Sequence, residues 1–514
     1  MKHIPKPIFF QRTLIRLKFA YFPILSFLPA VMAGFFYLPC VSAQGYTPAD
    51  PYYLLLNEKM QFERGTEFHS TAMRPFYNQS SKAISIWVKN ESYLNNNASN
   101  QENMDIRYIG NGFGSFNSVL ISGYSKYLAF NFEPFTLSTN YRDSKEYARP
   151  RPFTFLNDAK SNKNIKEVGL RKADIFLHYN GVGIGVSNDN MWWGPGIQGT
   201  LSMTNNTVGF NHFMAGTIRE LRWKNIGIMG KYTFSELNGK SGFEATYFTA
   251  LTGQFTIYSE QIFTFGLSRN YLTGGVDVGV PWTKSDAQKI VFEDVFIKNL
   301  QKLDYTVAGH DPWDQTMSGW FEMAFPKNKL KLYLEIGFND NRFNLWDFLV
   351  HPDHAMASIV GFRKYGLLNN DNLIMGFEYA NLIKGRHHIF RATPNWYDRG
   401  HYNDFSYEGR RWGAHSGSDS DDLLLYFGLM NEKWSFVPAF NFERHGVSTY
   451  RPPEIKMEMK IDMKYKYREY EFGLYFERQF EAHIGFPPDQ YFIDEVTGKR
   501  STNTAIFRIR KQIL

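Results

Sequence analysis

Cysteine is almost absent from this sequence: Cys40 is the only one in 514 residues. It lies in an N-terminal segment that we expect to be removed, so the mature chain would have no disulfide, thiolate metal site or cysteine nucleophile. Lipid attachment at Cys40 requires a small residue before it, and Pro39 stands there instead. Export without disulfides or a lipid anchor suits a bacterial envelope protein.

Long apolar runs are missing beyond the N-terminus. A basic stretch over residues 1–18 and an apolar stretch over 19–38 precede small residues at 41–43, which is the order of a cleaved secretory signal. An uncleaved anchor is the alternative, but Pro23 and Pro29 interrupt the apolar stretch. No later segment approaches the ~18 apolar residues of a membrane helix. We therefore expect the first 43 residues (1–43) to be a signal peptide.

A large charge of one sign is also missing. The chain has 57 Lys and Arg residues against 50 Asp and Glu, and five of those bases but none of the acids lie in the first 43 residues. The rest of the chain then has 52 bases against 50 acids, which argues against a basic nucleic-acid surface. A mean hydropathy of −0.39 excludes a helical membrane protein, and 17% aromatic residues exclude a disordered chain.

The main periodicity of the mature chain is two. Residues 456–467 alternate apolar and charged side chains, and residues 470–478 do so with the opposite parity. A two-residue turn at 468–469 predicts that change of parity, because paired residues share a face of the sheet. The predicted pairs are Tyr467/Tyr470, Tyr465/Phe472, Met463/Leu474 and Ile461/Phe476 on the apolar face, and Lys466/Glu471 and Lys460/Glu477 on the charged face.

Nine strands of this kind are predicted from residue 317 onward. Short turns and long connections alternate between them, so the long loops share one rim, which is typical of an outer-membrane barrel. Doubling the nine gives about 18 strands, with the Gly-rich and aromatic residues 104–280 supplying the first half. The expected strands lie near 317–326, 329–339, 356–366, 371–383, 421–430, 433–444, 456–467, 470–480 and 502–514.

The predicted fold is thus an all-β, transmembrane antiparallel barrel over residues 81–514. A lectin-like sandwich or a propeller is the soluble alternative, since both also alternate. A sandwich would place aliphatic residues on its apolar face, whereas here that face carries aromatics at strand ends and the opposite face is charged.

Residues 50–65 break the strand pattern and predict a short helix. Asp50 fits the N-cap, Pro51 the first helical position and Gly65 the C-terminal cap. Tyr52, Leu55, Leu56, Lys59 and Met60 share one face of that helix. We expect residues 44–80 to form a periplasmic helical segment that plugs the barrel. Residues 286–300 are consistent with either helix or strand.

The sharpest local signal is Trp192-Trp193-Gly194-Pro195-Gly196, a bulky aromatic pair beside a tight turn, followed by Asn205-Asn206. This stretch resembles the hallmark of the capsule assembly Wzi family of outer-membrane proteins. Residues 310–314 and 396–429 resemble later, weaker parts of the same family pattern. The resemblance implies a closed barrel with an N-terminal helical element and a lectin-like role in holding or assembling surface polysaccharide.

The residue types in the predicted outer loops agree with such a role. Aromatic faces pack against the C–H surfaces of sugars, while amides, carboxylates and arginines bind hydroxyl and acidic groups. Interfacial belts are the alternative for the aromatics, lumen packing for Trp192-Trp193, and a solvated rim for Arg410-Arg411. The candidate polysaccharide-binding residues are Trp192, Trp193, Asn205, Asn206, Trp313, Trp346, Trp396, Tyr397, Arg399, His401, Arg410, Arg411 and Trp412.

Catalytic and metal sites are not expected. His415, Ser416, Ser418 and the nearby acids lack a nucleophile-elbow motif and fit a polar turn better. His387-His388 and the His351/His354 pair have no evident acidic partners for a metal. No cofactor is expected, and no phosphate-cradling glycine loop or nucleic-acid motif is present.

The function predicted from the sequence is an outer-membrane barrel of a Gram-negative bacterium that binds or helps assemble capsular polysaccharide or exopolysaccharide. Its expected partners are surface polysaccharide, outer-membrane lipid and polysaccharide export machinery. A channel or porin for small solutes is the alternative, because a charged lumen suits either.

Overall fold

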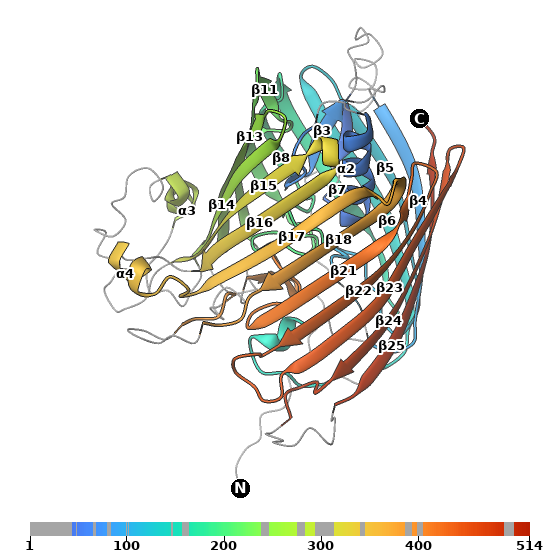
Figure 1. Ribbon diagram of the computed structural model, residues 1–514, viewed down its shortest axis with the longest axis vertical. Coiled ribbons are helices and arrows are strands. Elements are labelled where there is room, and N and C mark those ends of the chain that lie inside the picture. Colours follow the sequence, from blue (N-terminus) through green and yellow to red (C-terminus); the bar gives the residue numbers. More distant parts are fainter. Residues whose placement is uncertain are drawn as a thin grey trace. The chain divides into compact units, whose positions relative to one another are not determined.

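The computed structural model describes residues 44–47, 49–64, 68–79, 84–98, 100, 102–144, 147–156, 164–237, 246–274, 283–292, 313–339, 345–385, 393–397, 405–487 and 498–514. Within this part of the chain, nineteen β-segments close into one antiparallel barrel (Figure 1). β10 and β11 both pair with β12, so they share one position and the barrel has 18 strands. The predicted signal peptide lies outside the described residues.

The barrel strands follow one another around the wall in chain order, and β25 pairs with β4 to close it. Their bounds are β4 Ile84–Asn95, β5 Gly112–Tyr124, β6 Leu128–Tyr141, β7 Lys166–Tyr179, β8 Val182–Ser187, β10 His212–Thr217, β11 Leu221–Trp223, β12 Ile226–Leu237, β13 Thr246–Tyr258, β14 Ile262–Gly274, β15 Trp313–Phe325, β16 Leu330–Asn339, β17 Met356–Leu367, β18 Asn370–Asn381, β21 Ser420–Met430, β22 Trp434–His445, β23 Glu454–Tyr467, β24 Tyr470–Ala482 and β25 Arg500–Gln512.

The nine strands predicted from the C-terminal half are confirmed as β15–β18 and β21–β25. The register between β23 and β24 is also confirmed, including the predicted pairs Tyr467/Tyr470, Ile461/Phe476 and Lys460/Glu477. Directly opposed residues share a face, so the two-residue turn at 468–469 carries the whole alternating pattern from one strand to the next.

Each strand presents one face to the outside and one to the lumen. On β23 and β24 the outward Met459, Leu474 and Phe476 are exposed, whereas the inward Glu458 and Glu477 are fully buried. This distribution is the reverse of that in a soluble protein, and it requires an apolar medium outside the wall. Tyr465, Tyr467 and Tyr470 stand exposed beside the 468–469 turn, where an interfacial girdle is expected.

Short and long connections alternate around the barrel. The short ones, such as 224–225, 368–369 and 468–469, all lie at one rim, and the chain ends there too, where the Ile513 amide donates to the Ile86 carbonyl. The long ones, such as 188–211 and 382–419, lie at the other rim. This is the alternation that the sequence predicts, and it assigns the short-turn rim to the periplasmic side.

The N-terminal segment lies against the inner wall. Pro51–Tyr53 forms η1 and Leu54–Arg64 forms α2, which confirms the helix predicted over 50–65. The most buried side chains are those of Leu54, Glu58 and Lys59, so Lys59 is buried as one of the predicted face, whereas Leu55 and Met60 are only half-buried. Charged groups on the barrel wall decide which face of α2 turns inward, because the Glu58 carboxylate binds cations of β16 and β17.

Three small antiparallel sheets complete the strands: β1 Gln44–Thr47 with β3 Phe76–Gln79, β2 Met73–Arg74 with β9 Trp192–Trp193, and β19 Ser406–Tyr407 with β20 Arg410–Arg411. Short 3-10 turns occur at η2 Phe153–Phe155 and η6 Pro326–Asn328. No helix in the described part of the chain is long and apolar enough to cross a membrane.

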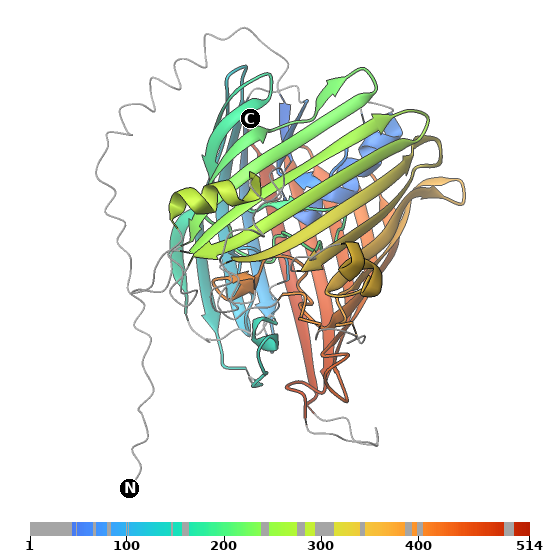
Figure 2. The ribbon, with the colours of Figure 1, turned by 90° about the vertical axis from the view of Figure 1, so that its left-hand side faces the viewer.

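Two short helices lie on the outer side of the wall near the long-loop rim (Figures 1 and 2). α3 Lys284–Phe292 settles the helix-or-strand question for the first part of residues 286–300 in favour of helix. It packs on β13 and β14, where the Thr249 hydroxyl donates to the Ala287 carbonyl at 2.6 Å, and it reaches β12, where the Tyr232 hydroxyl donates to the Gln288 carbonyl at 2.9 Å. α4 Leu345–Val350 follows β16.

Candidate functional site

The tryptophan pair and its turn lie inside the barrel. β9 pairs with β2 of the N-terminal segment, and both tryptophan rings are at most 1% exposed. The Arg74 guanidinium lies 4.4 Å from the centre of the Trp192 ring, a cation–π contact. Gly194 has a φ of +140°, which favours glycine, and its amide donates to the Ala72 carbonyl at 2.9 Å. The long loop 188–211 and the N-terminal segment therefore form one unit, which we call the plug.

Glu378 of β18 holds the turn of the plug against the wall. Its buried carboxylate accepts hydrogen bonds from three successive backbone amides, those of residues 197–199, at 2.7–3.0 Å. The Tyr333 hydroxyl donates to the same carboxylate at 2.7 Å. Glu335 of β16 accepts a further hydrogen bond from the Leu201 amide at 3.1 Å. Charge-assisted bonds of this kind are stronger than neutral ones, so the turn is fixed on this side of the lumen.

Glu58 fixes α2 to the same wall. Its fully buried carboxylate pairs with Arg363 at 2.7 Å and Lys331 at 2.8 Å, and it accepts hydrogen bonds from the Thr71 and Tyr365 hydroxyls at 2.7 and 2.9 Å. Burial alone would raise the pKa of Glu58, but the two neighbouring cations outweigh it and hold that pKa well below its usual range. The Arg363 guanidinium also donates to the Pro195 carbonyl at 3.0 Å, so one cation binds both parts of the plug.

The paired asparagines join three of the long loops. The backbone carbonyl of Asn205 accepts a hydrogen bond from the Asp105 amide at 2.8 Å. The side-chain amide of Asn206 donates to the Arg411 carbonyl at 3.2 Å. These contacts tie loops 96–111 and 382–419 to the plug, so the long loops close over the lumen instead of standing away from it.

An aromatic cluster fills the space between these loops and the wall. The Trp412 ring stacks on Phe210 with centroids 5.5 Å apart and meets Phe248 of β13 edge-on at 4.8 Å. Trp193 stacks on the same Phe248 at 6.3 Å. Such contacts stabilise by more than area burial alone. The lumen in this region is a packed core.

The predicted polysaccharide-binding residues differ widely in exposure. Arg399 and His401 lie outside the described residues, and Trp313 and Arg410 are half-buried. Trp346 on α4 is 73% exposed. The remaining eight are buried: Trp192, Trp193, Asn205, Asn206, Trp396, Tyr397, Arg411 and Trp412.

Trp396, Tyr397, Arg411 and Trp412 belong to a long connection, as predicted, but their side chains are buried. Their loop turns inward because the aromatic rings gain an apolar environment and their polar atoms find partners: the Tyr397 hydroxyl, for example, donates to the Leu201 carbonyl at 2.9 Å. Trp313 is also misplaced in the prediction, since it is the first residue of β15. Whether any of these residues binds sugar stays a prediction.

A network of buried charges joins the loops to β21–β24. His415 Nε2 lies 3.3 Å from both Glu443 and Asp422 and 3.7 Å from Glu102. Burial lowers the pKa of His415, but the facing carboxylates, Glu443 first, outweigh it and raise that pKa to about 9. The imidazolium therefore joins the loop to the wall through ion pairs with these carboxylates.

Some donor atoms of this network are close enough together to coordinate a metal ion. Among the described residues, Glu102, His415 and Glu443 bring ligand atoms within 4.8 Å of one another. The Lys456 ammonium contacts Glu102 and lies 2.9 Å from Glu443, so a cation of the chain itself stands between the two acids. We therefore interpret the group as an ion-pair network.

The serines beside His415 have structural partners. The Ser418 hydroxyl donates to the Tyr397 carbonyl at 3.0 Å, and the Ser420 hydroxyl donates to the Gly417 carbonyl at 2.6 Å. Both hydroxyls thereby hold the loop turn where the chain enters β21, which is the polar-turn role that the sequence favours.

Sequence reasoning missed the residues that hold the plug, namely Glu58, Arg363 and Glu378. Arg363 and Glu378 lie on predicted strands, and the alternation of apolar and polar residues along those strands predicts that both side chains point into the lumen. The strand pattern could not predict their binding partners, because the plug is distant in sequence from β17 and β18.

The family model described as capsule assembly protein Wzi matches residues 74–428, well over half of the chain. The solved structure of Escherichia coli Wzi is described as an outer-membrane protein involved in group 1 capsule assembly and a carbohydrate-binding β-barrel. It matches with a TM-score of 0.58 at 11% identity, over 91% of this chain and 99% of that chain. The sequence has no match among the curated proteins.

Two channel structures match less well. Pseudomonas aeruginosa OpdK with vanillate has a TM-score of 0.40 at 6% identity, over 84% of this chain and 98% of that chain. The outer-membrane channel DcaP of Acinetobacter baumannii has a TM-score of 0.34 at 6% identity, over 84% and 96% of the two chains. Similarity of this degree carries no argument about function.

Proposed function

Because the chain belongs to the capsule assembly protein Wzi family, we propose that it is an outer-membrane barrel that holds capsular polysaccharide or exopolysaccharide at the cell surface. The exposed apolar outer face and the tyrosine girdle support the membrane location. The barrel acts by binding, without catalysis, and polysaccharide export machinery supplies the polymer.

The observation that carries this proposal is the anchored plug. A channel needs a lumen that solutes can cross, whereas Glu58 and Glu378 bind the plug to the wall through buried, charge-assisted hydrogen bonds. Loops 96–111 and 382–419 then close the outer half of the lumen. A sealed barrel with long, interlocked outer loops suits retention of a polymer better than passage of solutes.

Among the predicted contact residues that the structure describes, Trp346 is the best candidate for direct contact, because its indole is the most exposed. Arg399 and His401 remain candidates by sequence. The buried aromatics Trp396 and Trp412 act indirectly, by holding loop 382–419 in the shape that the polymer meets.

The test is binding of the full-length protein in detergent to fluorescently labelled polysaccharide purified from the producing cells. We expect saturable binding that unlabelled polysaccharide displaces. Trp346→Ala should weaken it, and Trp434→Ala, an exposed tryptophan beside the short turn 431–433, is the matched control. Absence of saturable binding by the unaltered protein would contradict the proposed function.

The channel alternative rests on the charged inner face of β23 and β24, which would suit solute passage. Conductance across planar lipid bilayers separates the two functions. We expect the unaltered protein to be closed, and steady channels of nanosiemens scale would favour the channel.

A further inference from the structure

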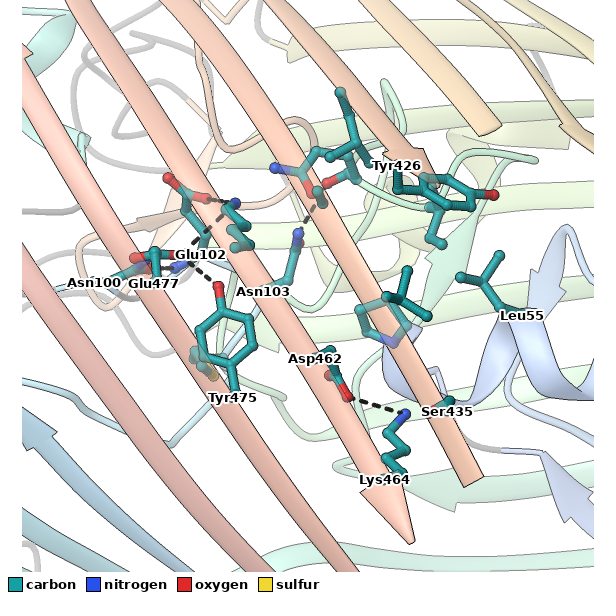
Figure 3. A pocket seen from close by; sticks show the side chains of 18 of the residues that line it. Leu55, Asn100, Glu102, Asn103, Tyr426, Ser435, Asp462, Lys464, Tyr475 and Glu477 are labelled. Carbon is teal, nitrogen blue, oxygen red and sulfur yellow. Dashed lines mark hydrogen bonds and ion pairs between the residues drawn. The ribbon is translucent and has the colours of Figure 1, made fainter. Parts of the chain in front are cut away.

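A cavity lies between the plug and one part of the barrel wall. Glu58 and Glu378 bind the plug to β16–β18, whereas beside these strands the cavity, of about 170 Å³, separates it from β21–β24 (Figure 3). α2, loop 96–111 and the turn after Gly196 form the inner side of this cavity. One water needs only ~10–15 Å³, so the space is large enough for a solute.

The cavity has an apolar side and a polar side. In Figure 3, Leu55 and Tyr426 lie on one side, while Asn100, Glu102 and Glu477 lie on the other. Ile197, Leu424, Val437 and Ala439 extend the apolar lining, and Asn103, Lys460, Asp462 and Lys464 extend the polar lining. A sugar ring has the same division, because its C–H faces are apolar and its hydroxyls form the rim.

Several buried polar atoms at the cavity have no hydrogen-bond partner among the described residues. They are Asn103 Oδ1, Tyr426 Oη and Gln198 Nε2, and the first two side chains are only 7% exposed. Leaving a buried polar atom unsatisfied costs about 1–3 kcal/mol. A bound molecule with hydroxyl groups would satisfy donors and acceptors alike, and its apolar faces would also cover the apolar lining, which water does not do.

The charges around the cavity compensate one another. Lys460 lies 3.5 Å from Glu102 and 3.9 Å from Glu477, and Lys464 lies 3.9 Å from Asp462. Among the described residues of the lining, two lysines face three carboxylates, so no cation there is left over to bind an acidic sugar. The lining therefore favours a neutral ligand over a uronic acid or a phosphate.

The cavity lies in the half of the lumen nearest the short-turn rim. Met430 and Ser435 flank the 431–433 turn, and they line both this cavity and a second one of about 30 Å³. The second cavity also includes the turn residues themselves. A ligand thus has its shortest approach from the periplasmic rim, which the outer loops do not cover.

We propose that this cavity is a binding site for one neutral sugar residue, entered from the periplasmic side. The proposal rests on the proposed function, since it assigns that sugar to the polysaccharide which the barrel holds. The outer loops then contact the polymer at the cell surface, and the cavity beside the plug receives a chain end or a single sugar unit from the periplasmic side.

The experiment uses saturation-transfer NMR on the full-length protein in detergent, with the methyl glycosides of glucose, galactose and mannose as separate probes. We expect saturation transfer to at least one of them. Ala439→Phe places a phenyl ring in the cavity and should abolish the transfer. Ala505→Phe makes the same change on the lipid-facing side of β25 and should leave it intact.

Asp462→Asn is the second variant, because it keeps the size of the side chain while removing the charge. We expect about tenfold weaker binding, as for loss of a hydrogen bond to a charged group. Heat-modifiable gel migration checks that each variant folds. No transfer to any probe, or unchanged binding by both cavity variants, would overturn the proposal. In either case, binding of labelled polysaccharide by the unaltered protein would leave the proposed function standing.

Discussion

Replacing Glu58 by alanine tests how firmly the plug is held. The carboxylate is fully buried and faces Arg363 at 2.7 Å and Lys331 at 2.8 Å. Removing it leaves the buried Arg363 without its acid, while Lys331 keeps its pair with Glu322, and breaking a buried pair in this way costs about 3–5 kcal/mol. The turn of the plug keeps its own contact with Glu378, so we expect α2 to leave the wall while the strands of the barrel stay folded.

Two assays measure that effect. The temperature at which heat-modifiable gel migration changes should fall for Glu58→Ala, and planar bilayers should record transient openings that the unaltered protein lacks. Glu260→Ala is the matched control, because its pair with Lys327 is exposed and surface pairs contribute little. The double variant Glu58→Ala/Arg363→Ala should lose less stability than the two single variants together, since it leaves neither the Glu58 nor the Arg363 charge without the other. A Glu58→Ala protein that behaves like the control would refute the anchoring role.

Three further predictions concern the loops and the turn. Glu378→Gln should speed hydrogen exchange at the amides of residues 197–199, because an amide side chain accepts fewer and weaker bonds than a carboxylate; unchanged protection would contradict its role. Trp412→Ala should destabilise the folded barrel by about 3–5 kcal/mol, measured by the same gel assay, whereas the exposed Trp346→Ala should change stability little; equal effects would be inconsistent with the packing. The ion pairs of His415 should stabilise the fold fully below the unfolded-state pKa of ~6.5, because folding raises that pKa, and this stabilisation should be lost as the pH rises through about 9. The difference in thermal midpoint between the unaltered protein and His415→Gln should therefore shrink over this pH range. A constant difference would argue against a stabilising role of the His415 ion pairs.

The barrel was predictable because residues that are neighbours in the sequence determine its strands and turns. Alternation along residues 456–467 and a two-residue turn are enough to set the register with β24, and the same rule locates the other strands of the C-terminal half. The apolar face then has to meet lipid, since the opposite face carries charges that only a lumen can satisfy.

The interior was not predictable in the same way. Composition identifies Tyr397 and Trp412 as aromatic loop residues, but their exposure depends on contacts with Leu201 and Phe248, which lie far away in the sequence. The same holds for Glu58, whose partners stand on β16 and β17. Periodicity says which way a strand residue points, and it contains no information about which loop or helix fills the lumen opposite it.

A barrel that retains polysaccharide at the cell surface should change how much polymer stays bound to the cell. The most direct measurement compares cell-bound with shed polysaccharide in the producing bacterium and in a strain that lacks this protein. We predict that total polysaccharide stays the same in the deletion strain while the cell-bound fraction falls, and that the unaltered gene restores the cell-bound fraction. An unchanged cell-bound fraction in the deletion strain would contradict the claim.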